Sequence, residues 1–330
     1  SALNMFDEYS MTNQRELAEF TGFTEQEVQE LCPAYDMPYE KMKQWYDGYD
    51  LKGIQIYNPR SVVMSLLGHD FDSYWTKTET YEALKKYIQM YNLKELVTKL
   101  IAGSSVAINP DKFQNDMTTF ASADDVLTLL VHLGYLTYDF DTRTVHIPNQ
   151  EVQKEFINCI EDGGWEPVMD AIRKSEELLN ATISGDEDTV ARIIEHVHQE
   201  NTSILAYNDE NSLACVISLA YYSAKKNYVI YRELVGGKGF ADLVFIPRKT
   251  TQAPAIVVEL KRNQTADAAI DQIKRKEYVQ SLKDYRGEVL LVGINYESKD
   301  SDGENYKKHF CKIERVTIAA GGGTGNLCRK

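Results

Sequence analysis

The stretch GFADLVFIPRKTTQAPAIVVELK, from Gly239 to Lys261, decides how the second half of the chain folds. It holds two apolar runs, GFADLVFIP and APAIVVELK, and the polar segment RKTTQ between them, which is the pattern of two β-strands joined by a turn. Side chains alternate across a strand, so Glu259 and Lys261 share one face while Leu260 points to the other. Pairing of the two strands as a hairpin would bring Asp242 close to the face that carries Glu259.

Two carboxylates beside an ammonium group, at the end of an apolar sheet, suit a hard divalent cation and an activated water. The acid-x-Lys spacing alone is not specific, because it also occurs at Asp50 to Lys52 and at Glu297 to Lys299. Those two copies lie in a Gly-flanked loop and in a polar run, whereas Glu259 ends a buried-strand pattern. On spacing alone, an ordinary salt bridge at the strand ends remains an alternative interpretation.

The segments around the hairpin extend this pattern. The apolar helix pattern ENSLACVISLA and the strand pattern YVIYREL precede it, and a helix capped by Thr265 and the buried-strand run GEVLLVGINY follow it. The order is helix, three strands, helix, strand. It resembles the core of the PD-(D/E)xK nuclease superfamily, with Asp242 and the Glu259-Leu260-Lys261 triplet as the signature.

This resemblance implies an α/β domain over residues 206–318 with a restriction-endonuclease-like αβββαβ core. It also implies a metal-dependent nuclease that hydrolyses phosphodiester bonds of nucleic acid, with DNA as the expected substrate and Mg²⁺ or Mn²⁺ as the cofactor. The implied catalytic residues are Asp242, Glu259, Lys261 and Gln272. The implied metal ligands are Asp242, Glu259, the backbone carbonyl of Leu260 and Glu210, with Tyr278 as a supporting residue. Glu233, in YREL, is a further acid close to the site in the sequence and a candidate additional ligand or supporting residue.

A second resemblance concerns KMKQWYDGYDLKGIQIYNPRSVVMSL, from Lys41 to Leu66. It resembles a block of bacterial proteins that join an AAA-ATPase-like region to a PD-(D/E)xK nuclease domain, although Arg60 stands where that family often has Trp. The chain contains no GxxxxGK[ST] motif to hold a nucleotide phosphate, so we expect no ATP hydrolysis. In that family the ATPase core would precede residue 1, and an ATPase region is therefore an expected partner.

The first half of the chain has the pattern of a mainly α-helical region. Its predicted helix starts are Thr24 with Glu27, Asn58 before Pro59, and Ser122 with Asp125. The run LTYDFDTRTVHIP predicts a small β-hairpin about Asp141. We therefore divide the chain into an ATPase-lid-like or winged-helix-like region at 1–150, a helical linker at 151–205, the nuclease-like domain at 206–318, and a flexible or vector-derived tail at 319–330.

Charge and composition narrow the functional class. Residues 1–200 hold 16 Lys and Arg against 35 Asp and Glu, a net charge of −19, whereas residues 201–330 hold 20 against 15, a net charge of +5. The basic part is the predicted nuclease domain, and its sign permits binding to nucleic-acid phosphates. The five dispersed cysteines include no CxxC pair and no apolar run is long enough to span a bilayer, so we expect reduced thiols and a cytoplasmic location.

Two other functions stay open at this point. The nuclease fold could be a relic that only binds nucleic acid, or it could be a protein-interaction module that regulates an ATPase region. No base-reading motif stands out, so the sequence indicates neither whether cutting is sequence-specific nor whether the substrate is DNA or RNA. Cutting both strands of a duplex would call for a homodimer.

Overall fold

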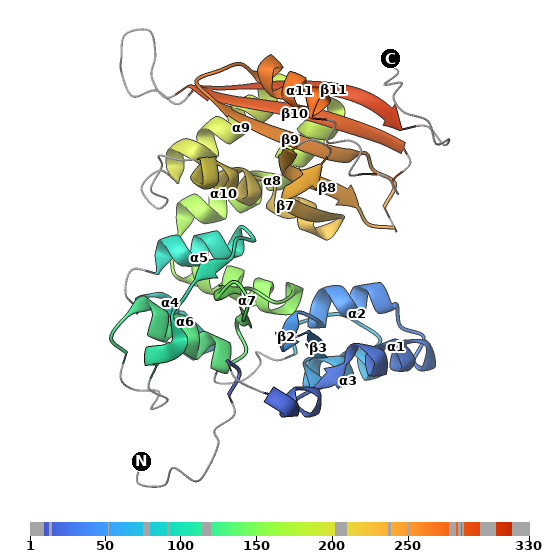
Figure 1. Cartoon of the computed structure of the whole chain (residues 1–330), viewed down its shortest axis with the longest axis vertical. Coiled ribbons are helices and arrows are strands. Elements are labelled where there is room, and N and C mark those ends of the chain that lie inside the picture. The colour runs from blue at the N-terminus through green and yellow to red at the C-terminus, as the bar shows by residue number, and fades with distance from the viewer. Residues whose placement is uncertain are drawn as a thin grey trace. The chain divides into compact units, whose positions relative to one another are not determined.

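The protein is described here by a computed structural model that covers residues 10–12, 15–51, 53–74, 80–90, 93–113, 120–201, 210–236, 239–249, 251–276, 282, 285, 287–297 and 308–318. The chain divides into two compact units, Ser1–Trp165 and Glu166–Lys330. Figure 1 shows both units with most of their helices and strands labelled. Each unit has its own helices, β-sheet and buried apolar cluster.

The first unit is mainly helical, as predicted. Its helices are η1 (Arg15–Phe20), α1 (Glu25–Ala34), α2 (Tyr39–Tyr46), α3 (Pro59–Gly68), α4 (Thr80–Ile88), α5 (Lys94–Ile101), η3 (Pro110–Lys112), α6 (Ala123–His132) and α7 (Gln150–Asp162). Its strands are β1 (Phe23–Thr24), β2 (Tyr49–Leu51), β3 (Ile54–Tyr57), β4 (Val106–Ala107), β5 (Thr137–Asp139) and β6 (Thr144–His146).

The predicted helix starts of this unit are confirmed. Thr24 and Glu27 form a capping box at α1, and Ser122 and Asp125 form another at α6. The Asn58 side chain caps α3 by accepting a hydrogen bond from the Ser61 backbone N–H. Each cap satisfies backbone donors that the first turn of a helix leaves without partners, which fixes where the helix begins.

The β-structure of this unit is larger than predicted. The hairpin about Asp141 is present as β5 and β6, and β4 joins it to give the strand order β4-β6-β5. A second three-stranded sheet has the order β1-β3-β2 and uses the segment from Tyr49 to Tyr57. Strands of two to four residues are too short for their alternation to be recognised in a sequence.

The Lys41–Leu66 block builds part of the buried core of this unit. Met42, Tyr46, Tyr57 and Leu66 belong to one apolar cluster. A fully buried carboxylate, Glu151 on α7, ties the block to the rest of the unit. It accepts hydrogen bonds from the Ser61 hydroxyl at 2.7 and 2.9 Å and from the Tyr74 backbone N–H at 2.7 Å. A buried charge requires such partners, so the block contributes to stability whatever else it does.

The second unit is an α/β structure, which confirms the predicted class. Its helices are α8 (Glu166–Ser184), α9 (Glu187–Glu200), α10 (Glu210–Ala220), η4 (Tyr222–Lys226) and α11 (Ala266–Arg275). Its strands are β7 (Tyr228–Gly236), β8 (Gly239–Pro247), β9 (Ala255–Arg262), β10 (Gly287–Glu297) and β11 (Lys308–Ile318). They form one sheet of order β11-β10-β9-β8-β7, in which β9 and β10 are parallel and the other neighbours are antiparallel.

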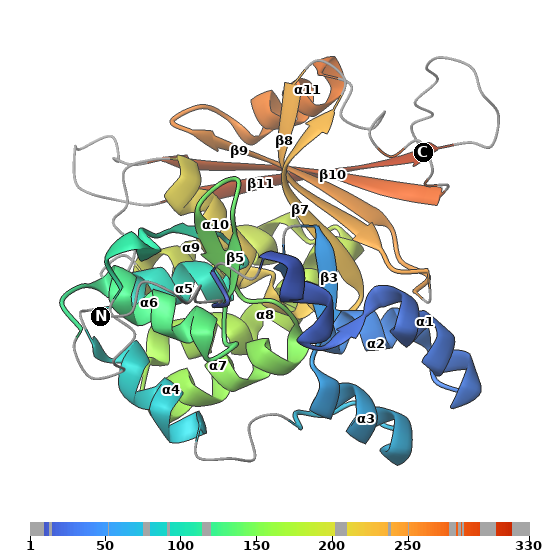
Figure 2. The ribbon, with the colours of Figure 1, turned by 60° about the horizontal axis from the view of Figure 1, so that its bottom comes forward.

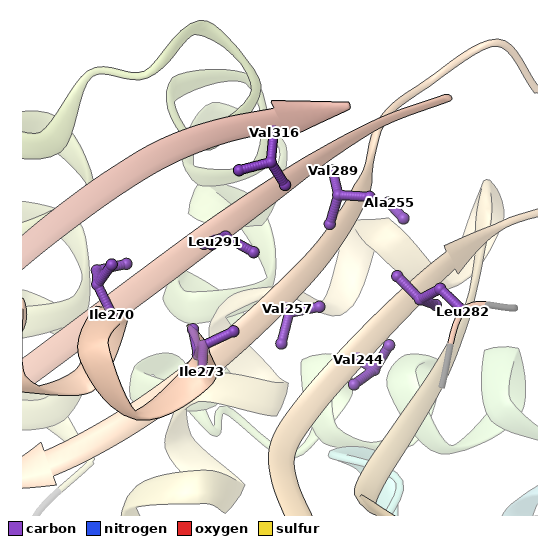
Figure 3. Packing of buried hydrophobic residues seen from close by; sticks show 9 residues of the cluster. All are labelled: Val244, Ala255, Val257, Ile270, Ile273, Leu282, Val289, Leu291 and Val316. Carbon is purple, nitrogen blue, oxygen red and sulfur yellow. The ribbon is translucent and has the colours of Figure 1, made fainter. Parts of the chain in front are cut away.

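Helices cover both faces of this sheet. Figure 2 shows α11 on one side of the strands and α8, α9 and α10 on the other. Under α11, Ile270 and Ile273 pack on valines and leucines of β8 to β11, as Figure 3 shows. On the opposite face, the Phe245 ring packs edge-on against Tyr221 and Tyr228. With both faces covered, β9 and β10 are almost entirely apolar and buried, and the few polar residues on them are therefore conspicuous.

The structure shows two features that the sequence analysis did not predict. The compact units divide between Trp165 and Glu166, inside the segment 151–205 that the sequence suggested as a linker. Helix α7 belongs to the first unit, whereas α8 and α9 pack in the second, where α9 contacts β11. The sheet also has a fifth strand, β11, that the sequence pattern did not predict. The suggested tail at 319–330 lies outside the described residues.

None of the helices in the described ranges combines the length and apolar character needed to cross a membrane.

Candidate active site

The β8–β9 hairpin places Asp242 beside the end of β9. The two strands pair from Leu243↔Val258 to Phe245↔Ile256. One residue further along, the Asp242 carboxylate accepts a hydrogen bond from the Leu260 backbone N–H at 2.7 Å. A side chain thus continues the link between the strands beyond their backbone pairing. This bond fixes the Asp242 carboxylate next to the Glu259–Lys261 segment.

Glu259 is the centre of the site. Its side chain is 2% exposed, and its Oε1 accepts hydrogen bonds from Lys261 Nζ at 2.7 Å and from Gln272 Nε2. The Lys261 side chain is 12% exposed, so this ion pair is largely removed from water. Loss of one partner of such a pair would leave the other charge buried and uncompensated, which is strongly destabilising. Glu259 and Lys261 thus lie on one face of β9, as their spacing indicates.

Helix α11 brings Gln272 to this face. The Thr265 side chain caps the helix by accepting a hydrogen bond from the Ala268 backbone N–H at 3.0 Å. Gln272 lies two turns into the helix and reaches Glu259 from above the sheet. The structure therefore brings together, from β8, β9 and α11, the four side chains that the sequence resemblance singled out: Asp242, Glu259, Lys261 and Gln272.

Two residues of β10 also position the site, and sequence reasoning missed both. Gly293 lies opposite Glu259 in the parallel pairing, and a Cβ placed on it would come within 2.3 Å of the Ala266 carbonyl oxygen. The absence of a side chain lets α11 approach the sheet this closely. Asn295 lies opposite Lys261, is 1% exposed, and accepts a hydrogen bond from the Gln264 backbone N–H at 3.0 Å. It holds the turn between β9 and α11 on the sheet.

No described contact places the other predicted residues in the site. Glu210 begins α10 and Glu233 lies on β7, but their side chains are not among those described. Tyr278 lies outside the described residues. Leu260 takes part through its N–H, and the role predicted for its carbonyl stays a prediction.

The donor set fits a hard divalent cation. Asp242 and Glu259 supply carboxylate oxygens, which Mg²⁺ prefers, and a Mg²⁺ site in proteins often has only one or two carboxylates and completes its shell with water and phosphate. Within the described ranges there is no cluster of three or more His, Cys, Asp or Glu side chains arranged to hold a metal ion. A site made by the protein alone, such as a structural zinc centre, is therefore not found there.

A surface cavity of about 700 Å³ lies elsewhere, in the first unit. Its walls come from the β2–β3 and β5–β6 hairpins and carry the carboxylates of Asp50, Asp139 and Asp141. Hydrogen bonds from the Thr142 and Asp141 backbone hold the pKa of the Asp139 carboxyl below its usual value despite partial burial, which keeps it charged. An acidic cavity repels phosphate, so it does not compete with the β8–β9 site as a place for nucleic acid.

Comparison with known proteins bears on the second unit only. Residues 208–305 match the family model described as the PD-(D/E)XK nuclease superfamily. The match includes Asp242, Glu259, Lys261 and Gln272 but covers less than a third of the chain, and it does not reach the Lys41–Leu66 block. No curated protein and no solved structure matched the chain. The match supports a restriction-endonuclease-like fold for this segment and nuclease activity in general.

Proposed function

We propose that the second unit is a metal-dependent nuclease that hydrolyses phosphodiester bonds, with DNA as its expected substrate. The observation that carries this proposal is the meeting of Asp242, Glu259, Lys261 and Gln272 at one end of the sheet, inside the segment that matches the nuclease model. The net charge of +5 on residues 201–330 adds support, since a basic domain attracts the phosphate backbone.

Asp242 and Glu259 would hold Mg²⁺ or Mn²⁺, with the Leu260 carbonyl and Glu210 as proposed further ligands. When bound there, the cation supplies a water of lowered pKa and stabilises charge that develops on the phosphate. The Leu260 N–H keeps the Asp242 carboxylate in place, and the Gln272 amide does the same for Glu259. Carboxylates held in this way lose little freedom when a ligand arrives, which favours binding.

Lys261 has a separate role in this proposal. Its ammonium lies 2.7 Å from Glu259 Oε1 and partly reaches solvent, so it stands where a water and the scissile phosphate would approach the carboxylates. A fixed positive charge there stabilises an attacking hydroxide and the additional negative charge of the transition state. Gln272 and Asn295 position the groups around it and need not touch the substrate.

The test is a cleavage assay on linear duplex, supercoiled and single-stranded DNA and on RNA, with Mg²⁺, with Mn²⁺ and with EDTA. Glu259→Gln and Lys261→Met are the test variants. Glu288→Gln and Lys312→Met control for the loss of a charge, because each removes one from a more exposed ion pair of the same unit. We expect cleavage that requires the metal and falls at least about a hundredfold in both test variants, which corresponds to roughly 3 kcal/mol of transition-state stabilisation.

Cleavage in EDTA, or full activity in Glu259→Gln, would contradict the proposed site. Nucleic-acid binding without any cleavage would instead favour a binding module, and the absence of both would favour a protein-interaction role. The four intact side chains of the site argue for the nuclease over these alternatives.

A further inference from the structure

The face of the sheet that carries the candidate site continues past it to the edge strand β11. Lys261 on β9 lies opposite Asn295 on β10, and Asn295 lies opposite Phe310 on β11. Residues directly opposite each other in a sheet point to the same face, so these three side chains form one row on the α11 side. With neighbouring strands about 4.8 Å apart, Phe310 lies roughly 10 Å from Lys261 across the sheet.

The Phe310 end of this row reaches solvent. Further along the strands the same face is buried under α11, where Leu291 and Val316 belong to the core (Figure 3). Phe310, however, is 37% exposed. Between Lys261 and Phe310 the turn from Asn263 to Thr265 crosses Asn295, and all three of its residues are exposed. A polar, accessible surface thus joins the site to an exposed aromatic ring.

A lysine accompanies this ring. Lys308 lies two residues before Phe310, points to the same face, and holds its Nζ 5.2 Å from the centre of the Phe310 ring. Two nearby lysines have carboxylate partners: Lys274 forms an ion pair with Glu314, and Lys312 forms one with Glu187. Within the described part of the chain, no carboxylate forms an ion pair with Lys308. Glu297 lies opposite Lys308 on β10, but no ion pair joins the two side chains, so the ammonium group can contact an anion from outside.

An exposed aromatic ring beside a lysine matches the way proteins bind a nucleic-acid strand whose bases are unpaired. Inside a duplex the base faces are covered by their neighbours, so a flat side chain stacks only on a base that has left the helix. The adjacent cation contacts the phosphate. The short distance from Lys261 allows one strand to reach both places.

We infer that Phe310 and Lys308 bind the substrate strand next to the cleavage site, Phe310 by stacking on an unpaired base and Lys308 by contacting a phosphate. The substrate class is then single-stranded nucleic acid or a strand with an unpaired segment at that point. This inference rests on the proposed nuclease function and goes further, since it names the substrate form and the residues that select it.

Binding of fluorescein-labelled oligodeoxynucleotides, measured by anisotropy in EDTA so that nothing is cut, tests the inference. One probe is single-stranded, and the other is a hairpin duplex containing the same sequence. The variants are Phe310→Leu, Phe310→Trp and Lys308→Gln. The matched control is Tyr231→Leu, because Tyr231 is an equally exposed aromatic residue, 41% exposed, on the opposite edge strand β7.

We expect Phe310→Leu to weaken binding of the single strand by about fivefold or more, the loss typical of one stacked base, and to leave duplex binding unchanged. Phe310→Trp keeps a stacking surface and should retain the affinity. Lys308→Gln should weaken binding of both probes and lower the salt dependence of single-strand binding by about 0.7 in log K per log salt. Tyr231→Leu should behave as the wild type.

Single-strand affinity in Phe310→Leu equal to that of the wild type would overturn the inference. An equal loss for both probes would also overturn it, since the ring would then act in folding or in contact with another protein. Parallel cleavage with Mg²⁺ separates the two proposals. If cutting requires the metal but is the same in Phe310→Leu as in the wild type, the nuclease proposal stands and this inference fails. If single-strand binding depends on Phe310 but nothing is cut, the strand-binding role of Phe310 stands and the nuclease proposal fails. A wild type that binds neither probe overturns both.

Discussion

Gly293 offers a test of how the site is held together, because this residue lies outside it. An added Cβ would lie 2.3 Å from the Ala266 carbonyl oxygen and 3.0 Å from Ala269 Cβ. Ordinary contacts of a Cβ are 3.4–4 Å, so the first turn of α11 would have to retreat by about 1 Å. The obstructing atom belongs to the backbone of α11, and a side-chain rotation cannot relieve it. Gly293→Ala therefore moves the helix.

Two consequences of Gly293→Ala are expected, and they can be measured separately. Overpacking of this kind costs about 1–3 kcal/mol, which should appear in the free energy of unfolding by urea. Gln272 moves with α11 and loses its position on Glu259, and a displacement of about 1 Å in an active site can cost roughly a hundredfold in rate. Metal-dependent cleavage should therefore fall by about that factor in protein that is still folded.

Ala269→Gly is the matched control for Gly293→Ala. It alters the same contact by removing a methyl group from α11, and the added helix glycine costs about 1 kcal/mol of stability. Because nothing pushes the helix from the sheet, cleavage should persist. Gly293→Val should exceed Gly293→Ala in both effects. If Gly293→Ala unfolds within about 0.5 kcal/mol of the wild type and cleaves at full rate, the close approach of α11 to β10 does not position the site.

Two further predictions concern charged groups of the second unit. Asp242→Asn should abolish cleavage but keep an oxygen that accepts the hydrogen bond from the Leu260 N–H. Asp242→Ala should also abolish cleavage and, in addition, lower the free energy of unfolding in urea by about 1 kcal/mol. Equal stability of the two variants would contradict the structural role of that hydrogen bond. Burial lowers the pKa of the Lys225 ammonium to about 8 from an ordinary 10.5, so the unfolded chain gains a proton before the folded one and stability is lost as pH falls from 10.5 to 8. Lys225→Met should thus raise the free energy of unfolding by about 1–2 kcal/mol at pH 7. This is less than the full pKa shift implies, because the Lys225 side chain partly reaches solvent and lies over the Tyr222 ring. The gain in the free energy of unfolding should shrink toward pH 10, and a gain that does not change with pH would contradict burial of the charge as its cause.

Local signals in the sequence predicted much of this structure. Thr24, Ser122 and Thr265 mark helix starts because a cap involves residues within one turn of each other. The alternation along β9 places Glu259 and Lys261 on one face, and the turn before β9 returns the chain so that β8 lies beside it. These features depend on neighbours in the chain, and a sequence shows such neighbours directly.

Features that depend on distant pairing escaped the sequence analysis. Gly293 and Asn295 position the site because of the register between β9 and β10, which are parallel strands joined through α11. The glycine inside GEVLLVGINY was the available signal, since a glycine within a buried strand often marks a close backbone approach. The strand β11 alternates irregularly between exposed and buried residues and lacks the clear period of a half-buried strand. The sequence suggested that α8 and α9 belong to a linker, because the pattern of an amphipathic helix does not show which surface the helix covers.

The packing of α8 and α9 sets the length of chain that the second unit needs in order to fold. His198 Nδ1 lies 2.9 Å from His309 Nε2 in a buried pair between α9 and β11. The carboxylates of Glu187 and Glu195 accept hydrogen bonds from backbone N–H groups of β11 at 2.9 and 3.0 Å, and the Thr182 hydroxyl bonds to Tyr221 at 2.7 Å. A chain that began at residue 208, where the family match begins, would lack α8 and α9, so β11 would lose these acceptors and α10 would be the one remaining α-helix of the described residues on that face of the sheet. The second unit therefore needs the chain from about Glu166 to the end of β11 at Ile318 to fold, which is more than the segment 208–305 that the family model matches.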